Sequence, residues 1–266
     1  ITPTFGKPTG MRFFLMLRTL GSFAACLTKA TGGKMPADHE TIRIWGLAGG
    51  YSSKDFFLFR EVLGGGGPGR PWADGSDVVH IVPNSRNLPA EFSETRYPIF
   101  IEKLGLKENS AGAGYRRGGF GYDKQIKTLV DARLISNADR SVLSCYGVYG
   151  GKASGPYSVS VLNETGQETR HPGMCDTVMV QSKDSVRIVT TGGGGWGDPL
   201  KREIDKVVYD LQCGLISEDA AREQYGVVVQ LEGRKWIADK DETSSLREKM
   251  SKLNANLPMF DRGEEF

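Results

Sequence analysis

The sequence has few of the residues on which most metal and thiol chemistry depends. Its 266 residues include three histidines and four cysteines. The cysteines are far apart and form no C-x-x-C pair, which excludes the usual zinc-binding and thioredoxin-like motifs. A histidine-rich metal site is not expected from this chain, and we expect the thiols to be reduced and mostly buried.

An excess of charge of one sign is also lacking. The formal net charge is +2 and the sequence has no basic stripe. Nothing therefore favours a nucleic acid or an anionic membrane as a partner. No segment supplies the roughly 20 apolar residues that a membrane-spanning helix needs. These absences predict a cytoplasmic protein that binds neither nucleic acid nor membrane.

The most apolar segment lies near the first residue. Arg18 interrupts its apolar run and no small-residue cleavage site follows, which argues against a signal peptide. Phe14, Leu17, Leu20 and Ala24 share one helical face. We therefore predict an amphipathic helix that packs on the rest of the domain.

Glycine is abundant. The 35 glycines are well above the average of about 7% and imply many turns and close backbone contacts. Short β-branched segments, separated by turn residues, lie at residues 124–130, 142–148, 157–162 and 176–180. These patterns predict an α+β fold, with a largely antiparallel β-sheet unit, glycine-rich loops, an N-terminal helix and a C-terminal helical hairpin.

The C-terminal part of the sequence has helical periodicity. Residues 203–213 and 217–225 predict the two helices of the hairpin, and Ser217 is a typical N-cap of the second. Residues 239–253 predict a charge-rich, solvated helix. Residues 254–266 are expected to form a loose tail.

The central feature is the stretch T-T-G-G-G-G-W-G-D-P at residues 190–199, between a predicted strand and a predicted helix. A glycine-rich loop before a helix can bind phosphate. This one lacks both the Lys-Ser/Thr of a P-loop and the spacing of a dinucleotide fingerprint. We therefore favour a tight structural turn, and expect residues 192–197 to pack against residues 112–121 or against a partner subunit. Trp196 is interpreted as a core or interface anchor, or as the cover of a pocket.

Acidic residues gather in residues 74–94, together with His80. Their spacing fits no known metal-ligand signature, and a solvated loop is the simpler interpretation. Glu91 and Glu94 lie three apart, so they can share one face of a helical turn and one can raise the pKa of the other. Arg96 offers them an ordinary ion pair instead.

Two arginines follow within a glycine-rich segment. There a guanidinium can bind a carboxylate or phosphate through two hydrogen bonds, or form a structural ion pair. The candidate catalytic residues are Asp74, Glu91, Glu94 and Arg116. The candidate substrate-binding residues are Arg117, Trp196 and Asp198. No residue is marked out as a nucleophile.

Three motifs together resemble the hydantoinase B/oxoprolinase family. They are E-F-S-E-T-R-Y-P at residues 91–98, S-A-G-A-G-Y-R-R-G-G-F-G at residues 110–121, and G-G-G-G-W-G-D-P at residues 192–199. The resemblance extends over about residues 35–229. It implies two parts, the C-terminal half of a B-type subunit at residues 1–229 and a C-terminal helix and tail at residues 230–266. The structural glycine turns would be formed by Gly112, Gly114, Gly118, Gly119, Gly192, Gly193, Gly194 and Gly195.

The resemblance implies an enzyme in a multisubunit complex. An A-type partner would bind ATP and phosphorylate a carbonyl or enolate oxygen, and the B-type subunit would complete the reaction. The expected activity is ATP-dependent hydrolysis of a cyclic amide. Carboxylation of a ketone and a non-catalytic assembly role are the alternatives.

Family B-type subunits are about twice as long and carry their metal-binding motif in the N-terminal half. The resemblance therefore implies a divalent metal bound outside this chain, no metal ligand within it, and an N-terminal B-type portion or subunit as a further partner. The first residue, Ile1, fits a fragment, a processed product or a chain with further sequence upstream.

Overall fold

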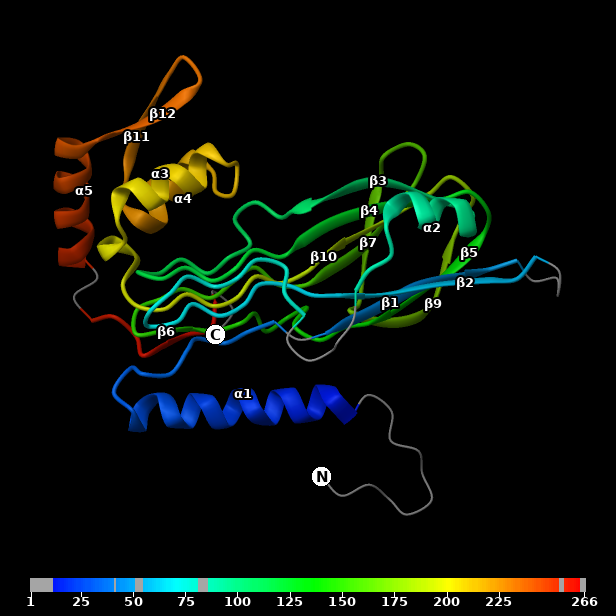
Figure 1. Cartoon of the computed structure of the whole chain (residues 1–266), viewed down its shortest axis with the longest axis horizontal. Helices are drawn as coiled ribbons and strands as arrows, with labels where there is room; N and C mark the ends of the chain where they lie inside the picture. The colour runs from blue at the N-terminus through cyan, green and yellow to red at the C-terminus, as the bar shows by residue number, and fades with distance from the viewer. Residues whose placement is uncertain (1–11, 41, 51–54, 81–85, 254–255, 264–266) are drawn as a thin grey trace.

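The structure is a computed structural model that describes residues 12–40, 42–50, 55–80, 86–253 and 256–263. A β-sandwich forms one end, and helices and a small hairpin form the other (Figure 1). Extended segments with little regular secondary structure run between the two ends. One long helix, α1 (Arg12–Ala30), lies along the outside.

The first sheet of the sandwich has four antiparallel strands, in the order β2-β1-β5-β9. They are β1 (Arg43–Gly49), β2 (Phe57–Leu63), β5 (Ala132–Asn137) and β9 (Met174–Val180). Buried and exposed residues alternate along much of β2. A strand with one face in a core has this pattern because successive side chains point to opposite faces.

The second sheet has five antiparallel strands, in the order β3-β4-β10-β7-β8. They are β3 (Ile99–Leu106), β4 (Tyr122–Thr128), β7 (Ser158–Leu162), β8 (Glu168–His171) and β10 (Ser185–Val189). The short helix α2 (Ala90–Arg96) packs on β3.

The two sheets enclose one apolar core. Trp45 and Phe59 of the first sheet belong to the same buried cluster as Ile126 and Ile188 of the second. The ring of Phe59 meets the edge of Trp45 at 5.6 Å between ring centres, and Tyr97 at 5.3 Å. Large aromatic rings in edge-to-face contact give this half of the molecule a conventional side-chain core.

Extended glycine-rich segments continue the sandwich strands toward the helical end. We call residues 64–69, 110–121, 146–152 and 190–197 the glycine bundle. Within it, the two-residue strand β6 (Gly147–Val148) pairs with β13 (Phe260–Asp261). Figure 1 shows the segments as parallel wavy traces between the sandwich and the helices.

The helical end has a second apolar cluster. The elements here are η1 (Pro199–Lys201), α3 (Ile204–Gln212), α4 (Glu218–Tyr225), β11 (Val228–Glu232), β12 (Lys235–Asp239) and α5 (Lys240–Leu253). Val207 and Leu211 of α3 pack with Tyr225 of α4 and Phe120 of the glycine bundle. The helical hairpin therefore shares a core with the bundle.

Helix α1 (Arg12–Ala30) rests on the glycine bundle. Phe14 and Leu17 are buried, while Leu20 is 53% exposed. The hydroxyl of Tyr146 donates to the carbonyl of Gly21 at 3.0 Å, and that of Tyr149 to the carbonyl of Thr28 at 2.7 Å. These bonds hold the second half of α1 on the bundle.

The predicted α+β fold is confirmed, including its antiparallel sheets, N-terminal helix and helical hairpin. The Ser217 side chain accepts a hydrogen bond from the amide of Ala220 at 3.1 Å, as an N-cap should. The charge-rich helix is also present, as α5. None of the described helices is long and apolar enough to cross a membrane.

Four expectations were wrong. Leu20 does not share the buried face with Phe14, because it lies on the opposite side of α1. Residues 256–263 of the expected loose tail contain β13, whose pairing with β6 orders them. Cys26 and Cys213 are exposed, so burial is not the rule for the thiols. In residues 142–148 only Gly147 and Val148 form a strand.

Candidate functional site

Gly193 lies at the centre of the glycine bundle. Its amide donates to the carbonyl of Gly119 at 3.0 Å, and its carbonyl accepts from the amide of Gly112 at 2.9 Å. A Cβ added to Gly193 would overlap the carbonyl of Gly67, and one added to Gly118 would overlap the carbonyl of Gly193. The segments approach so closely because neither carries a side chain there.

The next two glycines are held in the same way by other segments. The amide of Gly194 donates to the carbonyl of Asp38, and that of Gly195 to the carbonyl of Lys152, both at 2.9 Å. The amides of Trp196 and Gly197 also donate within the protein. These donors are therefore engaged, and none of residues 193–197 has an amide left to bind a phosphate.

The predicted packing of residues 192–197 against residues 112–121 is confirmed by these contacts. The expected tight turn is wrong. Among residues 192–197 only Gly197 has a positive φ, of 73°, so the four successive glycines run extended. Their lack of Cβ serves close packing, not a left-handed conformation.

A buried charge network fixes the helical hairpin on the bundle. The guanidinium of Arg202 donates two hydrogen bonds to the carboxylate of Asp74, at 2.8 and 2.9 Å. It donates a third to Asp210 of α3 at 2.9 Å. Arg117 donates to Asp210 at 3.2 Å and to Asp77 at 3.1 Å. Two-pronged contacts between a guanidinium and a carboxylate are the strongest of the charge-assisted hydrogen bonds.

The network explains the ionisation of Asp74. Burial alone would raise the pKa of this carboxyl group, but the hydrogen bonds and positive charge of Arg202 outweigh it and lower the pKa. The amide of Arg117 also donates to Asp74 at 3.1 Å. Asp74 and Arg117, predicted for catalysis and substrate binding, are thus both committed to contacts inside the protein, and their roles in a reaction stay predictions.

The other catalytic candidates lie apart from this network. Glu91 is exposed on α2, while Glu94 accepts a hydrogen bond from the amide of Ile101 at 2.8 Å and so holds the start of β3. Helix α2 lies at the sandwich end, far from α3 and α4 (Figure 1). Arg116 stacks over the ring of Tyr115 at 4.6 Å and lies 4.0 Å from Glu203. The structure therefore does not bring the four predicted catalytic residues together.

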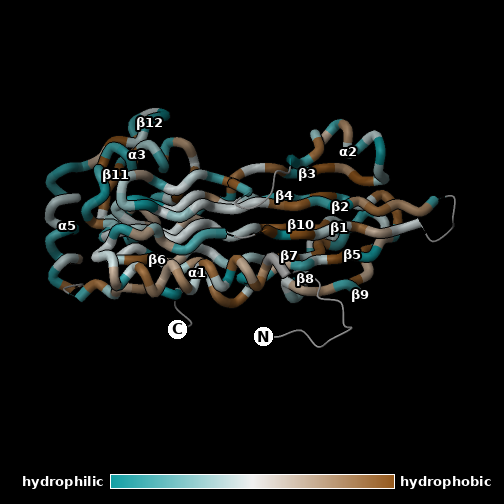
Figure 2. The backbone as a smooth tube through the Cα atoms, turned by 60° about the horizontal axis from the view of Figure 1, so that its bottom comes forward, coloured by the Kyte–Doolittle hydropathy of each residue, from teal (hydrophilic) through white to brown (hydrophobic). Residues whose placement is uncertain are grey.

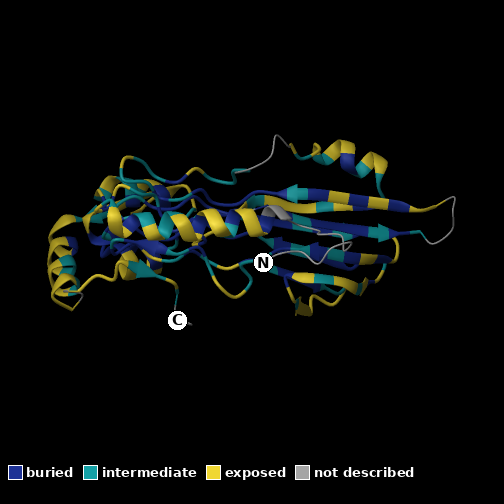
Figure 3. Ribbon diagram, turned by 90° about the horizontal axis from the view of Figure 1, so that it is seen from below, coloured by how far each residue is buried: buried dark blue, intermediate teal, exposed yellow. Residues whose placement is uncertain are grey.

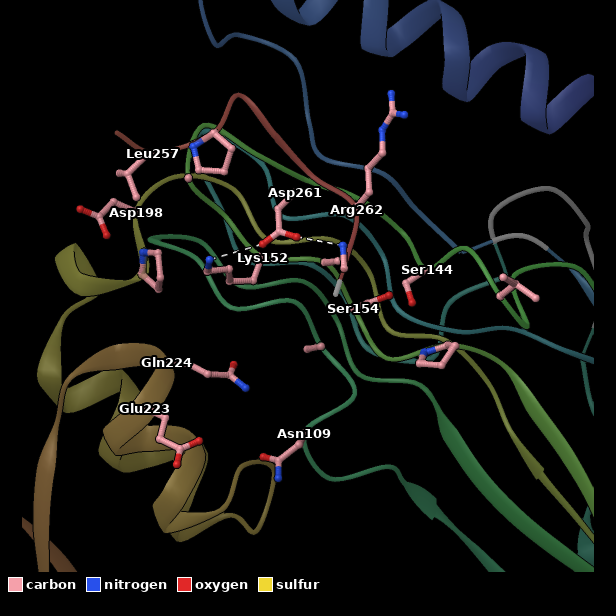
Figure 4. A pocket seen from close by; sticks show the side chains of 18 of the residues that line it. Asn109, Ser144, Lys152, Ser154, Asp198, Glu223, Gln224, Leu257, Asp261 and Arg262 are labelled. Atoms are coloured by element: carbon pink, nitrogen blue, oxygen red, sulfur yellow. Dashed lines mark hydrogen bonds and ion pairs between the residues drawn. The ribbon is translucent and has the colours of Figure 1, made fainter. Parts of the chain in front are cut away.

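A groove of about 1190 Å³ opens between the helical hairpin, the glycine bundle and the C-terminal segment (Figure 4). Charged side chains of both signs line it: Lys152, Arg170 and Arg262 are basic, and Asp198, Glu223 and Asp261 are acidic. Lys152 lies 3.4 Å from Asp261. The groove is large enough to hold a small molecule, and its charged side chains supply both hydrogen-bond donors and acceptors.

Asp198 is the only residue of the predicted site that lines this groove. Its side chain also accepts from the amide of Leu200 at 2.9 Å and caps η1. Trp196, the neighbouring candidate, is half-buried, and its ring lies 6.1 Å from that of Tyr149. Sequence reasoning missed Lys152, Glu223 and Asp261, which lie on segments that no motif connects.

A second buried cluster of charges lies where α1 meets the bundle. Glu40 and Arg43 are both fully buried and 2.9 Å apart, and Thr191 of the central motif donates to Glu40. Burial raises the pKa of Glu40 to about 7, although Arg43 and Thr191 act against it. Burial also raises the pKa of Cys145 to about 12, so this thiol is not poised as a nucleophile. No sequence pattern indicated this cluster.

Among the described residues, no group of three or more His, Cys, Asp or Glu side chains is placed to hold a metal ion. The acids and the histidine noted in the sequence do not converge on one point. The described residues therefore form no site that fits a divalent metal.

The sequence model of the family described as Hydantoinase B/oxoprolinase matches residues 1–199. The chain belongs to this family. A relative from Pseudomonas sp. (strain NS671), named as the putative B-type subunit of a D-/L-hydantoinase, is 28% identical over 229 residues. The match covers 85% of this chain and 38% of the relative.

Two solved structures share the fold. The ATP-dependent caprolactamase from Pseudomonas jessenii has a TM-score of 0.68 and 25% identity, over 84% of this chain and 40% of that one. Acetone carboxylase in its nucleotide-free form has a TM-score of 0.67 and 23% identity, over 81% of this chain and 34% of that one. The chain thus spans well under half the length of the hydantoinase relative and of both solved structures.

Proposed function

We propose that this chain is the C-terminal portion of a B-type catalytic subunit, which hydrolyses a cyclic amide together with an ATP-binding A-type subunit. The family match over residues 1–199 carries the proposal. The names of the hydantoinase and caprolactamase relatives refer to rings that contain an amide bond. The likeness to acetone carboxylase is below 25% identity and supports the fold alone.

The groove supports the proposal. A cyclic amide offers a carbonyl oxygen that accepts hydrogen bonds and an N–H group that donates one. Lys152 and Arg262 supply donors in the groove, and Asp198 and Asp261 supply acceptors. Opening the ring breaks the C–N bond, and a water molecule gives its hydroxyl group to the carbonyl carbon and a proton to the nitrogen.

ATP would be bound by the partner. In this chain the amides of residues 193–197 all donate within the protein, so the central glycine segment does not fit a phosphate group. A divalent metal would be bound outside the described residues. Both expectations match a complex in which this portion contributes a substrate-binding wall.

The test is ATP consumption by the purified complex with three substrates offered separately: a hydantoin, a lactam, and a ketone with bicarbonate. We expect ATP turnover with the hydantoin or the lactam and one opened ring per ATP consumed. Turnover with the ketone and bicarbonate alone would favour the carboxylase alternative. The A-type subunit and the whole B-type subunit must both be present, because this chain alone is expected to be inactive.

A structural role without chemistry is the second candidate, because the predicted catalytic residues lie apart. Asp198→Asn separates the two roles, since asparagine caps a helix as well as aspartate does but removes the charge from the groove. We expect at least about a tenfold loss of turnover, equivalent to about 1.4 kcal/mol, with normal complex assembly. The control is Glu164→Gln on the exposed loop after β7. Unchanged turnover for Asp198→Asn would favour the assembly role.

A further inference from the structure

Helix α1 is apolar on two opposite faces. The inner face carries the buried side chains of Phe14 and Leu17. On the outer face, four large apolar side chains are half exposed or more: Leu15 (50%), Met16 (50%), Leu20 (53%) and Phe23 (62%). Figure 3 looks onto this side of the molecule, and Figure 2 shows the apolar colouring of α1.

The outer residues follow one helical stripe. Its positions are Leu15, Met16, Thr19, Leu20, Phe23, Cys26 and Leu27. Their spacing is that of a single face of a helix with 3.6 residues per turn, and none of them is charged. A surface helix normally presents charged or polar residues on its solvent side, so this helix has the composition of one that is covered on both sides.

The charge of α1 confirms which side faces inward. Arg18 makes an ion pair with Asp139 at 3.1 Å and lies 3.9 Å from Asp38, both of them under the helix. The inner face is thus anchored by ion pairs as well as by the hydrogen bonds to Gly21 and Thr28. The exposed stripe is therefore not a consequence of a loosely placed helix.

The size of the relatives indicates what covers the stripe. This chain spans 38% of the hydantoinase relative and 40% of the caprolactamase chain. More than half of each of those polypeptides has no counterpart in residues 1–266. A large apolar stripe on the protein surface marks a protein–protein contact, and the lengths of the relatives point to the B-type portion without a counterpart here as its occupant.

We propose that the outer face of α1 is the docking surface for the remaining B-type portion, whether it belongs to the same polypeptide or to a separate one. The inference rests on the proposed B-type assignment. The occupant presents an apolar surface to Leu15, Leu20 and Phe23, because charged groups would be buried there without partners.

The native cysteines provide the test. Cys26 lies on the stripe and Cys213 lies at the end of α3, and both are exposed. The rate at which a maleimide modifies each thiol is measured by peptide mapping, on the 266-residue chain alone and on the same chain assembled with the remaining B-type portion. No A-type subunit is present. We expect assembly to slow modification of Cys26 at least about tenfold and to leave Cys213 unchanged, since a buried thiol is inaccessible.

A variant pair gives an independent measurement. Leu20→Glu places a charge on the stripe, and Leu231→Glu places one on β11, where the side chain is equally exposed at 56%. We expect Leu20→Glu to weaken binding of the remaining B-type portion at least about tenfold, while Leu231→Glu binds normally. Circular dichroism checks that both variants fold.

Three results would overturn the inference. They are an unchanged rate at Cys26 in the assembled complex, normal binding by Leu20→Glu, and concentration-dependent protection of Cys26 in the chain alone, which would identify a second copy as the occupant. The ATP assay separates this inference from the proposed function. If the complex opens rings while Cys26 stays reactive, only the docking surface is contradicted. If Cys26 is protected but no substrate is turned over, only the proposed function is contradicted.

Discussion

The β-sandwich and the glycine bundle are continuous along the chain but are stabilised by different contacts. Strand β2 runs on into residues 64–69, and β10 runs on into residues 190–197. In the sandwich, side chains such as Trp45 and Phe59 fill the space between two sheets. In the bundle, carbonyl oxygens occupy the space where side chains would be.

The two regions differ in the amino-acid substitutions that they tolerate. A side-chain core can lose or rearrange a methyl group, because neighbouring side chains move slightly. A core of packed backbone has no side chain to shrink or rotate, so every substitution of a central glycine adds volume. The hydrogen bonds between segments also fix their spacing, since a shift of one segment would leave buried amides without partners.

The largest expected effect comes from the charge network that fastens the helical hairpin to the bundle. Arg202→Met leaves the half-buried carboxylate of Asp74 without its guanidinium partner and removes one of the two guanidinium partners of the buried Asp210. Such a loss costs about 3–5 kcal/mol, measured as the change in free energy of unfolding by urea denaturation. The matched control is Lys206→Met, because Lys206 forms an exposed ion pair with Glu203, and exposed ion pairs contribute little to stability. Equal losses of unfolding free energy in the two variants would show that the network contributes no more than an exposed ion pair.

A single added methyl group in the bundle comes next. Gly194→Ala places a Cβ onto the carbonyl of Tyr146, although the φ of Gly194 is not positive. We expect a loss of about 3 kcal/mol in the free energy of unfolding, at the upper end for overpacked sites. Gly105→Ala is the control, because its Cβ would meet no atom within 4 Å. A Gly194→Ala protein that melts and assembles normally would contradict the backbone-packing account.

The stability of the buried cluster of Glu40 and Arg43 should depend on pH. Burial raises the pKa of Glu40 from 4.5 to about 7, so the folded protein holds this proton more tightly than the unfolded chain. The contribution of Glu40 to stability is therefore greatest below pH 4.5 and falls as the pH rises from 4.5 to about 7. Above about pH 7 the folded protein bears the full cost of burying the ionised carboxylate of Glu40.

Glu40→Gln removes the titrating group. The difference in unfolding free energy between wild type and variant should change by about 2 kcal/mol between pH 5 and pH 7.5, given about 1.4 kcal/mol for each unit of pKa shift. The control is Glu164→Gln, which makes the same replacement at an exposed loop position. If the wild type instead becomes more stable relative to Glu40→Gln as the pH rises, the pKa of Glu40 is lowered in the folded protein and not raised.

The smallest effect tests the sandwich. Ile188→Val removes one methyl group from a fully buried side chain and should cost about 1 kcal/mol. Thermal melting and urea denaturation would measure it. Comparison with Gly194→Ala is the sharpest test of the two regions, because one carbon removed from the sandwich should matter less than one carbon added to the bundle.

Local sequence patterns were sufficient for the helices. The Ser217 cap and the apolar spacing of Val207 and Leu211 act over a few residues, so the hairpin could be predicted from neighbouring positions alone. The alternation of apolar and polar residues in β10 predicted the strand before residues 190–199 for the same reason. The composition of α1 indicated a helix, but not that its second apolar face would be left exposed.

The candidate site depended on residues far apart in the chain. Asp74 and Arg202 are 128 residues apart, and no local pattern pairs them. The groove brings Lys152, Asp198 and Asp261 together from three segments. A sequence-based expectation could find Asp198, because it belongs to a motif, but it had no means to find the other two.

The glycines show where local information ends and the fold takes over. Four successive glycines dictate that something approaches the backbone closely, because any other residue would place a Cβ there. They do not dictate whether the chain turns or extends, since glycine adopts both conformations at little cost. That choice came from distant segments, because the carbonyls of Gly119, Asp38 and Lys152 accept hydrogen bonds from the amides of residues 193–195 and hold the run extended.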